Sequence, residues 1–207
     1  IPMNIHINTP EGTRDRLFSE CLERRQVQGA LVALFRRRGY TEVITPEVEY
    51  YDLFVQSGNP IPQEAMLKII DRSGKIMVMR PDCTAPIARV AATKLKSQAL
   101  PQRLYYDQTV FRDRLAHQGG SREIAQCGVE MIGAVGDKAD LEMVAMAVEA
   151  LRACGLGQFH IELGHAGFYR ALAGRMKMPG DELERLRGAI EGKNFALLND
   201  LLEPYRA

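Results

Sequence analysis

The segment from Phe111 to Gly133 constrains the fold more than any other part of the sequence, because it reads as two strands joined by a polar loop. Residues 102–112, which lead into it, are rich in Tyr, Val and Phe, side chains that favour extended structure. Residues 122–132 alternate with the period of two that is typical of a half-buried strand. We therefore predict an antiparallel strand pair, against which the rest of the chain must pack.

The second of these strands has two different faces. One carries Ala125, Cys127, Val129 and Met131, and the other carries Gln126, Gly128 and Glu130. Gln126 and Glu130 lie roughly 13 Å apart on a strand that rises about 3.4 Å per residue, and Gly128 should leave space between them. An amino-acid-sized ligand could lie there, with a carboxylate or phosphate near Arg112 at the strand end. The alternative is a sheet face that is simply exposed to solvent.

Periodicity and turn residues place the remaining elements. An apolar stripe predicts a helix from Leu17 to Phe35, and we interpret the basic run Arg36–Arg38 before Gly39 as the end of this helix rather than as a phosphate site. Residues 1–8 should be a frayed arm. We also expect a strand over 42–45, a hairpin of 66–70 with 75–79, helices over 84–96 and 137–154, a strand over 158–163, and helical segments over 169–207. These elements indicate an α+β fold.

The predicted hairpin leads into Arg80-Pro81-Asp82-Cys83-Thr84, just before a predicted helix. Asp82 or Thr84 could serve only as the N-cap of that helix, because short polar side chains satisfy the free backbone N–H groups there. The same two side chains could instead bind a ligand. The sequence pattern leaves both interpretations open.

Composition excludes several classes of protein. Hydrophobic residues make up 46% and charged residues 26%, as in folded globular chains, and no apolar run approaches the length of a membrane span. The cysteines are too far apart for a zinc site or a disulfide framework, so we expect reduced thiols and a cytoplasmic protein without a metal. The net charge of +1 does not favour a nucleic-acid partner.

Four segments, in this order, resemble class II aminoacyl-tRNA synthetases in their histidyl form: Gly12-Thr13-Arg14-Asp15, the motif-1-like run Gly39–Glu49, Arg80-Pro81-Asp82-Cys83-Thr84-Ala85, and the motif-2-like stretch Phe111–Gly133. The resemblance implies a mixed, mainly antiparallel sheet flanked by helices. It also implies one catalytic-core domain over residues 1–207, truncated on its C-terminal side at the helical segment 169–207. In that family the region that matches Gly39–Pro46 forms a dimer interface.

Two departures from the synthetase pattern concern the residues that bind the nucleotide. Arg112 keeps the position that binds the α-phosphate, but the glutamate that reads adenine is replaced by Arg114, and a guanidinium has no acceptor for the adenine amino group. In the following loop, 115–122, only Gly119 and Arg122 match the loop of the family, and most of its basic residues are lost. The amino-acid-binding positions are kept while most nucleotide-binding positions are lost.

This combination resembles the histidyl-synthetase-like regulatory subunits of ATP phosphoribosyltransferase. The resemblance implies a protein without catalytic residues or cofactor, which activates the short-form catalytic subunit and mediates its inhibition by histidine. Asp82, Thr84 and Gln126 would hold the histidine ammonium and Glu130 the imidazole, with Arg112 beside them. Two alternatives are a histidyl-tRNA synthetase, which activates histidine with ATP and Mg²⁺, and a stand-alone amino-acid sensor or ligase of the same fold.

Overall fold

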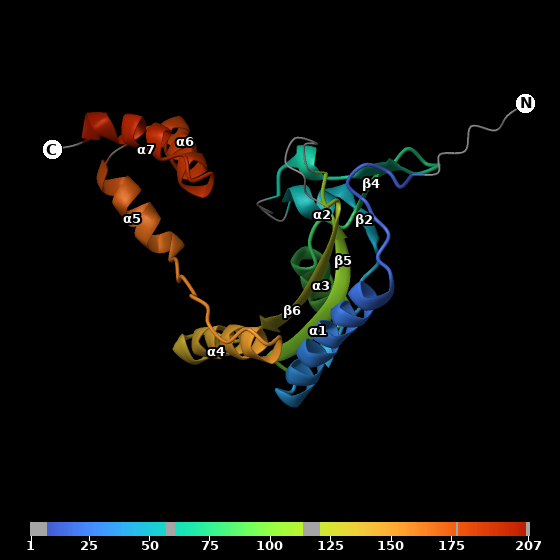
Figure 1. Cartoon of the computed structure of the whole chain (residues 1–207). Helices are drawn as coiled ribbons and strands as arrows, with labels where there is room; N and C mark the ends of the chain where they lie inside the picture. The colour runs from blue at the N-terminus through green and yellow to red at the C-terminus, as the bar shows by residue number, and fades with distance from the viewer. Residues whose placement is uncertain (1–7, 57–60, 114–120, 177, 206–207) are drawn as a thin grey trace, which may run out of the picture. The chain divides into compact units, whose positions relative to one another are not determined.

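The computed structural model describes residues 8–56, 61–113, 121–176 and 178–205. The chain divides into two compact units, Ile1–Phe159 and His160–Ala207. The elements of the first unit (Figure 1) are α1 (Phe18–Arg37), β1 (Thr41–Glu42), β2 (Val48–Tyr50), α2 (Tyr51–Gln56), a 3₁₀ turn (Gln63–Ala65), β3 (Lys68–Ile70), β4 (Ile76–Met79), α3 (Thr84–Thr93), β5 (Gln102–Phe111), β6 (Glu123–Ile132) and α4 (Asp137–Ala153).

The first unit contains two small sheets. In the larger one, with the order β1-β5-β6, β1 pairs with β5 in parallel, and β5 pairs with β6 in antiparallel register from Gln102↔Ile132 to Phe111↔Glu123. In the other, with the order β2-β4-β3, all strands are antiparallel. The predicted α+β class, with a mixed and mainly antiparallel sheet flanked by helices, is confirmed.

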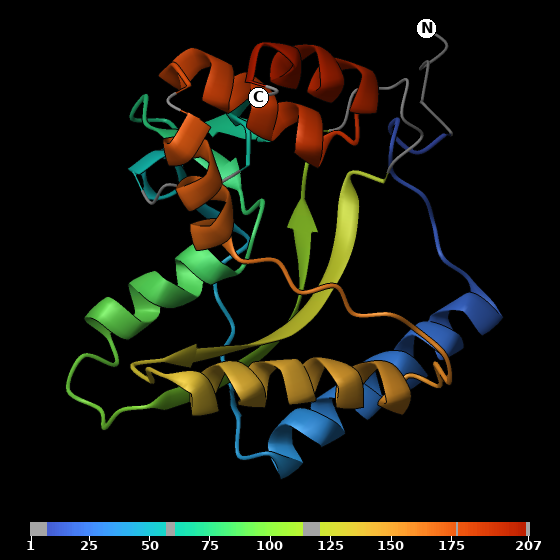
Figure 2. The ribbon, with the colours of Figure 1, turned by 90° about the vertical axis from the view of Figure 1, so that its left-hand side faces the viewer.

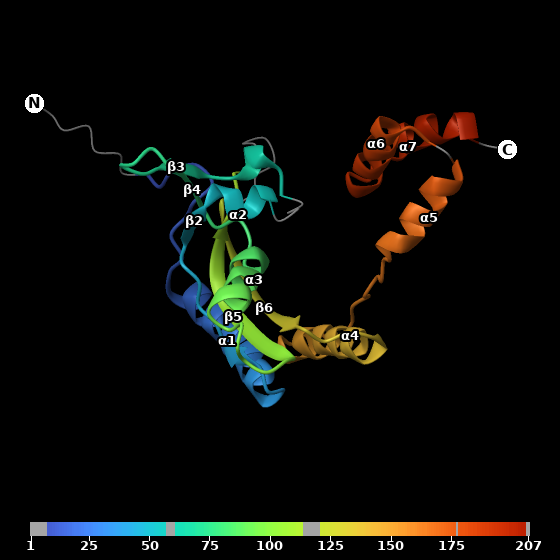
Figure 3. The same cartoon turned by 180° about the vertical axis from the view of Figure 1, so that it is seen from behind.

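Helices cover both faces of the β5–β6 pair. On one face, α1 and α4 lie against each other and enclose a core of Leu34, Phe35, Tyr40, Tyr105 and Met146. On the other face, α3 packs over Cys83, Ile87, Leu104, Tyr106 and Val110. Figure 2 shows α1 and α4 crossing near one end of the strand pair, and Figure 3 shows α3 beside it from behind. Neighbouring residues of β5 therefore enter different cores, as period-two geometry requires.

Arg80 ties the smaller sheet to the larger one. Its side chain is only 3% exposed, and its guanidinium donates to the carbonyl oxygens of Thr45 (2.6 Å), Pro46 (3.1 Å) and Thr109 (2.8 Å). The N–H of Phe111 in turn donates to the carbonyl of Arg80 at 2.9 Å. These bonds fix the chain at the end of β4, and so they place the segment that follows against the polar face of β6.

Most predicted elements are confirmed, with shifted ends. The predicted hairpin appears as β3 and β4. Of the strand expected over 42–45, only Glu42 belongs to β1. The prediction of a strand over 158–163 is wrong. These residues have no regular secondary structure and join neither sheet of the described chain. An alternating sequence cannot form a strand unless a neighbour supplies backbone hydrogen bonds. Of the predicted frayed arm 1–8, residues 1–7 lie outside the described residues.

The second unit is helical, as predicted for 169–207. It contains α5 (Ala166–Met176), α6 (Gly180–Glu191), α7 (Phe195–Leu202) and a final 3₁₀ turn (Glu203–Tyr205). Its core is formed by Met178, Leu186, Ala189 and Leu201. Within the part of the chain that the structure describes, no helix is both long enough and apolar enough to cross a membrane.

Candidate functional site

Four of the five residues singled out in the sequence form one polar cluster. The Thr84 hydroxyl donates to Glu130 Oε1 at 2.7 Å, and the Gln126 amide nitrogen contacts Asp82 Oδ1 at 3.3 Å. Asp82 and Thr84 come from the start of α3, whereas Gln126 and Glu130 come from β6. The polar face of β6 is therefore half-buried beneath the start of α3 and is not an open solvent-exposed surface.

Local backbone structure orients the α3 side of this cluster. Asp82 Oδ2 accepts a hydrogen bond from the backbone N–H of Thr84 at 3.1 Å, as short acidic side chains often do at the start of a helix. The N-cap of α3 is Cys83, so the prediction of Asp82 or Thr84 as the N-cap is wrong: Asp82 lies one residue before the cap and Thr84 is the first helical residue. The other carboxylate oxygen of Asp82 faces Gln126. The local hydrogen bond to Thr84 therefore uses only one of the two carboxylate oxygens of Asp82.

The space predicted above Gly128 is not empty. Tyr106 lies opposite Gly128 in the β5–β6 register, and a Cβ atom on Gly128 would lie 2.7 Å from the Tyr106 hydroxyl oxygen. Glycine is needed here because any larger residue would meet the tyrosine ring. Tyr106 is thus a site residue that the sequence reasoning missed, although the pairing of strands 102–112 and 122–132 could have found it.

The cluster has more acceptors than donors. Burial raises the pKa of Glu130, the neighbouring Asp82 carboxylate raises it further, and the hydrogen bond from Thr84 opposes both effects. The amide oxygen of Gln126 is buried and has no hydrogen-bond partner among the described residues. A buried acceptor without a donor is costly. A ligand with several N–H groups and positive charge would satisfy this arrangement.

Arg112 lies at the end of β5 and is held separately from the other four residues. Its Nε donates to the carbonyl oxygen of Pro81 at 2.9 Å, and its backbone N–H donates to the carbonyl of Arg122 at 3.0 Å. Arg122 forms an ion pair with Asp113 at 2.9 Å. Arg114, on which the loss of adenine recognition was argued, and the loop residues 115–120 lie outside the described residues.

Cys83 is buried beside the cluster, whereas Cys127 is half-buried on the opposite face of β6. Burial raises the pKa of both Cys83 and Cys127 to about 12, so both remain protonated near neutral pH. All four cysteines are free thiols. Among residues 8–56, 61–113, 121–176 and 178–205, no group of three or more His, Cys, Asp or Glu side chains is arranged to hold a metal ion.

Comparison with known proteins shows which sequences the chain is similar to. A sequence model described as histidyl-tRNA synthetase matches residues 12–207. Proteins named ATP phosphoribosyltransferase regulatory subunit from Acetivibrio thermocellus and Clostridium kluyveri are each 42% identical to this chain, over 96% and 93% of its length respectively. The matches cover 48% and 49% of those proteins, so the chain spans about half the length of these relatives.

Solved structures agree with the observed fold. A Bacillus halodurans protein, described as an ATP phosphoribosyltransferase regulatory subunit/histidyl-tRNA synthetase, superimposes with a TM-score of 0.87 at 32% identity, over 96% of this chain and 51% of its own. A histidine–tRNA ligase subunit from Alicyclobacillus acidocaldarius has a TM-score of 0.86 at 23% identity, over 98% of this chain and 58% of its own, which supports the fold alone.

Proposed function

Because the chain belongs to the histidyl-tRNA synthetase family, we propose that it is the histidine-binding part of an ATP phosphoribosyltransferase regulatory subunit. In this proposal it catalyses no reaction. It activates a short-form catalytic subunit and transmits inhibition by histidine to that subunit. The names of the relatives at 42% identity support this function over that of a synthetase.

The excess of hydrogen-bond acceptors in the polar cluster is the observation that supports histidine binding. Asp82 accepts from the Thr84 backbone N–H and the Gln126 amide nitrogen, and Glu130 accepts from the Thr84 hydroxyl. The amide oxygen of Gln126 is buried and has no partner among the described residues. The ammonium of histidine would supply N–H donors to Asp82, Thr84 and Gln126, and an imidazole N–H would reach Glu130. Arg112 would bind the carboxylate of the amino acid.

Feedback regulation places a physical requirement on this site. Histidine must bind one state of the assembly more tightly than the other, and the free-energy difference equals the coupling between histidine and activity. Couplings of this kind are typically about 1–3 kcal/mol, which corresponds to roughly a 5- to 150-fold change in affinity. A site made from β6 and the start of α3 can meet this requirement if the two elements shift relative to each other between states.

Self-association is a second part of the proposal. We place a dimer interface at Gly39–Pro46, because β1 pairs only with β5 among the described strands and its other edge is free. Ile44, which lies just beyond the end of β1, is 77% exposed. An exposed apolar side chain beside a free strand edge favours association with another chain.

Calorimetric titration of the full-length protein with L-histidine tests the site. Glu130→Gln removes the charge that faces the imidazole and should weaken binding by at least about tenfold. Glu123→Gln is the matched control, because Glu123 lies on the same strand but on its opposite face. Equal histidine affinity in the two variants would contradict the proposed site.

A second assay separates the proposal from the synthetase alternative. Histidine-dependent exchange between ATP and pyrophosphate reports activation of the amino acid. We expect no exchange by the full-length protein with Mg²⁺ present. Exchange above background would show that the protein activates histidine as a synthetase does.

A further inference from the structure

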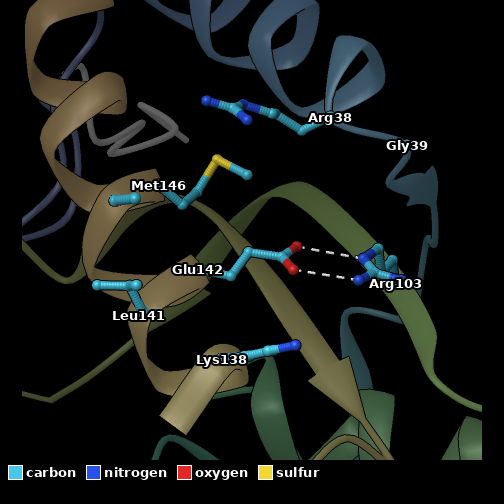
Figure 4. A pocket seen from close by; sticks show the side chains of 8 residues that line it. Arg38, Gly39, Arg103, Lys138, Leu141, Glu142 and Met146 are labelled. Carbon is cyan, nitrogen blue, oxygen red and sulfur yellow. Dashed lines mark hydrogen bonds and ion pairs between the residues drawn. The ribbon is translucent and has the colours of Figure 1, made fainter.

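A cleft that shares no residue with the polar cluster lies between α4 and the turn that follows α1. It has a volume of about 590 Å³, within the range of small-molecule sites. Figure 4 shows Arg38 toward one end, Lys138 at the other, and Arg103 between them. Leu141 and Met146 add apolar surface on the α4 side. The cleft thus combines three cations, the Glu142 carboxylate and an apolar wall.

The two arginines are paired but keep free donors. Arg103 binds Glu142 through Nε at 3.2 Å and Nη2 at 3.1 Å. Arg38 binds Glu149 through Nε at 2.9 Å and through Nη2. A guanidinium carries five N–H donors, and Nη1 of either arginine donates to none of the residues that the structure describes. Lys138 forms no ion pair with any residue that the structure describes.

Two acidic residues of α4, Glu142 and Glu149, lie on the same side of the helix as Lys138, and each is paired with one of the two arginines. At 100° per residue, Lys138, Glu142 and the apolar positions share one face, whereas Asp140 points to the opposite side. The side chains of Arg38 and Arg103 are 50% and 35% exposed, so solvent screens their ion pairs with the two glutamates. The cleft is left with positive charge that the two carboxylates do not fully balance.

We propose that this cleft binds a small organic dianion, a phosphate ester or a dicarboxylate, between Arg38, Arg103 and Lys138. The anionic groups accept hydrogen bonds from the free guanidinium N–H groups and from the ammonium, in the charge-assisted geometry that proteins use for phosphate and carboxylate. The carbon skeleton of the ligand packs on Leu141 and Met146. The basic run at the end of α1 thus has a second role besides ending the helix.

Titration of the full-length protein with two probes, pyrophosphate and succinate, tests this inference. Lys138→Gln should weaken binding of the preferred probe by about tenfold, because it removes one charged donor. Lys96→Gln is the matched control, an exposed lysine beyond the end of α3 that does not line the cleft. Comparison of the probes shows whether the dianion is a phosphate or a dicarboxylate.

Arg112→Gln distinguishes the cleft from the proposed histidine site. Loss of probe binding in Lys138→Gln, with binding kept in Lys96→Gln and Arg112→Gln, supports the cleft. Binding that survives in Lys138→Gln but is lost in Arg112→Gln overturns it. Absence of binding by both probes also overturns it, as does capture of only an acidic peptide such as poly-glutamate, which would make the cleft a protein-docking surface.

Discussion

Glu130 is the residue on which the proposed chemistry depends most. It is half-buried on β6, accepts a hydrogen bond from Thr84, and lies near a second carboxylate, that of Asp82. Burial makes ionisation of Glu130 unfavourable, and Asp82 adds repulsion. A cationic ligand would relieve both effects. Glu130 is therefore placed so that ligand binding and ionisation are coupled.

This coupling predicts how stability depends on pH. The pKa of Glu130 is higher in the folded protein than in the unfolded chain, so between the two values the folded state binds more protons and stability falls as pH rises. Glu130→Gln removes this effect, and its melting temperature relative to wild type should rise from acidic to neutral pH in the absence of histidine. Thermal scans from pH 4 to 8 check this, and a constant difference would contradict it.

Gly128 gives a second prediction about single residues. Gly128→Ala puts a Cβ atom 2.7 Å from the Tyr106 hydroxyl oxygen, and the resulting displacement of a buried ring should cost about 1–3 kcal/mol of unfolding free energy. Histidine binding should weaken as well. Gly157→Ala is the control, since nothing lies within 4 Å of its added Cβ. Chemical denaturation of both variants measures the difference. Equal stability would show that the Tyr106 ring moves aside without a loss of unfolding free energy.

At the level of elements, the alternation of β6 allowed the sequence to predict both its faces and the cluster on its polar side. The pattern reports which way side chains point, but it does not report what lies above them. Tyr106 was missed for this reason, because its position over Gly128 depends on the register between two strands. The strand predicted over 158–163 failed for the same reason, since alternation alone does not supply a pairing partner.

Arg80 was recognised only as part of a motif, and its role between the sheets required the structure. Arg80→Lys replaces a planar fork by a single ammonium, which cannot reach the carbonyls of Thr45, Pro46 and Thr109 together. We expect a loss of about 2–4 kcal/mol in unfolding free energy, because buried carbonyls lose their donors. Arg72→Lys, in the exposed β3–β4 turn, is the control in the same denaturation experiment. A loss no larger than in the control would contradict this role.

At the scale of the whole molecule, the order of four short segments predicted the family, which the match over residues 12–207 confirms. The chain spans about half the length of its curated relatives, 48% in Acetivibrio thermocellus. Single-residue periodicity could not have given the family, because the arrangement of helices on both faces of the sheet depends on contacts between residues far apart in sequence. Assembly and regulation therefore have to be tested on the full-length protein.

The proposed dimer is tested at this scale. Ile44→Lys places a charge on a residue that is 77% exposed beside the free edge of β1, and it should shift the full-length protein from dimer toward monomer in light scattering coupled to gel filtration. Val135→Lys changes another exposed apolar residue, 95% exposed and between β6 and α4 rather than beside a strand edge, and it should leave the mass unchanged. An unaltered dimer in Ile44→Lys would place the interface elsewhere.

One measurement tests the central claim most directly. The full-length protein is mixed with the short-form ATP phosphoribosyltransferase of the same organism, and phosphoribosyl-ATP formation is followed with and without histidine. We predict activity that depends on this protein and falls with histidine, and a Glu130→Ala mixture that assembles and is active but is no longer inhibited. A mixture no more active than the catalytic subunit alone would contradict the regulatory function, and a Glu130→Ala mixture still fully inhibited by histidine would contradict the site.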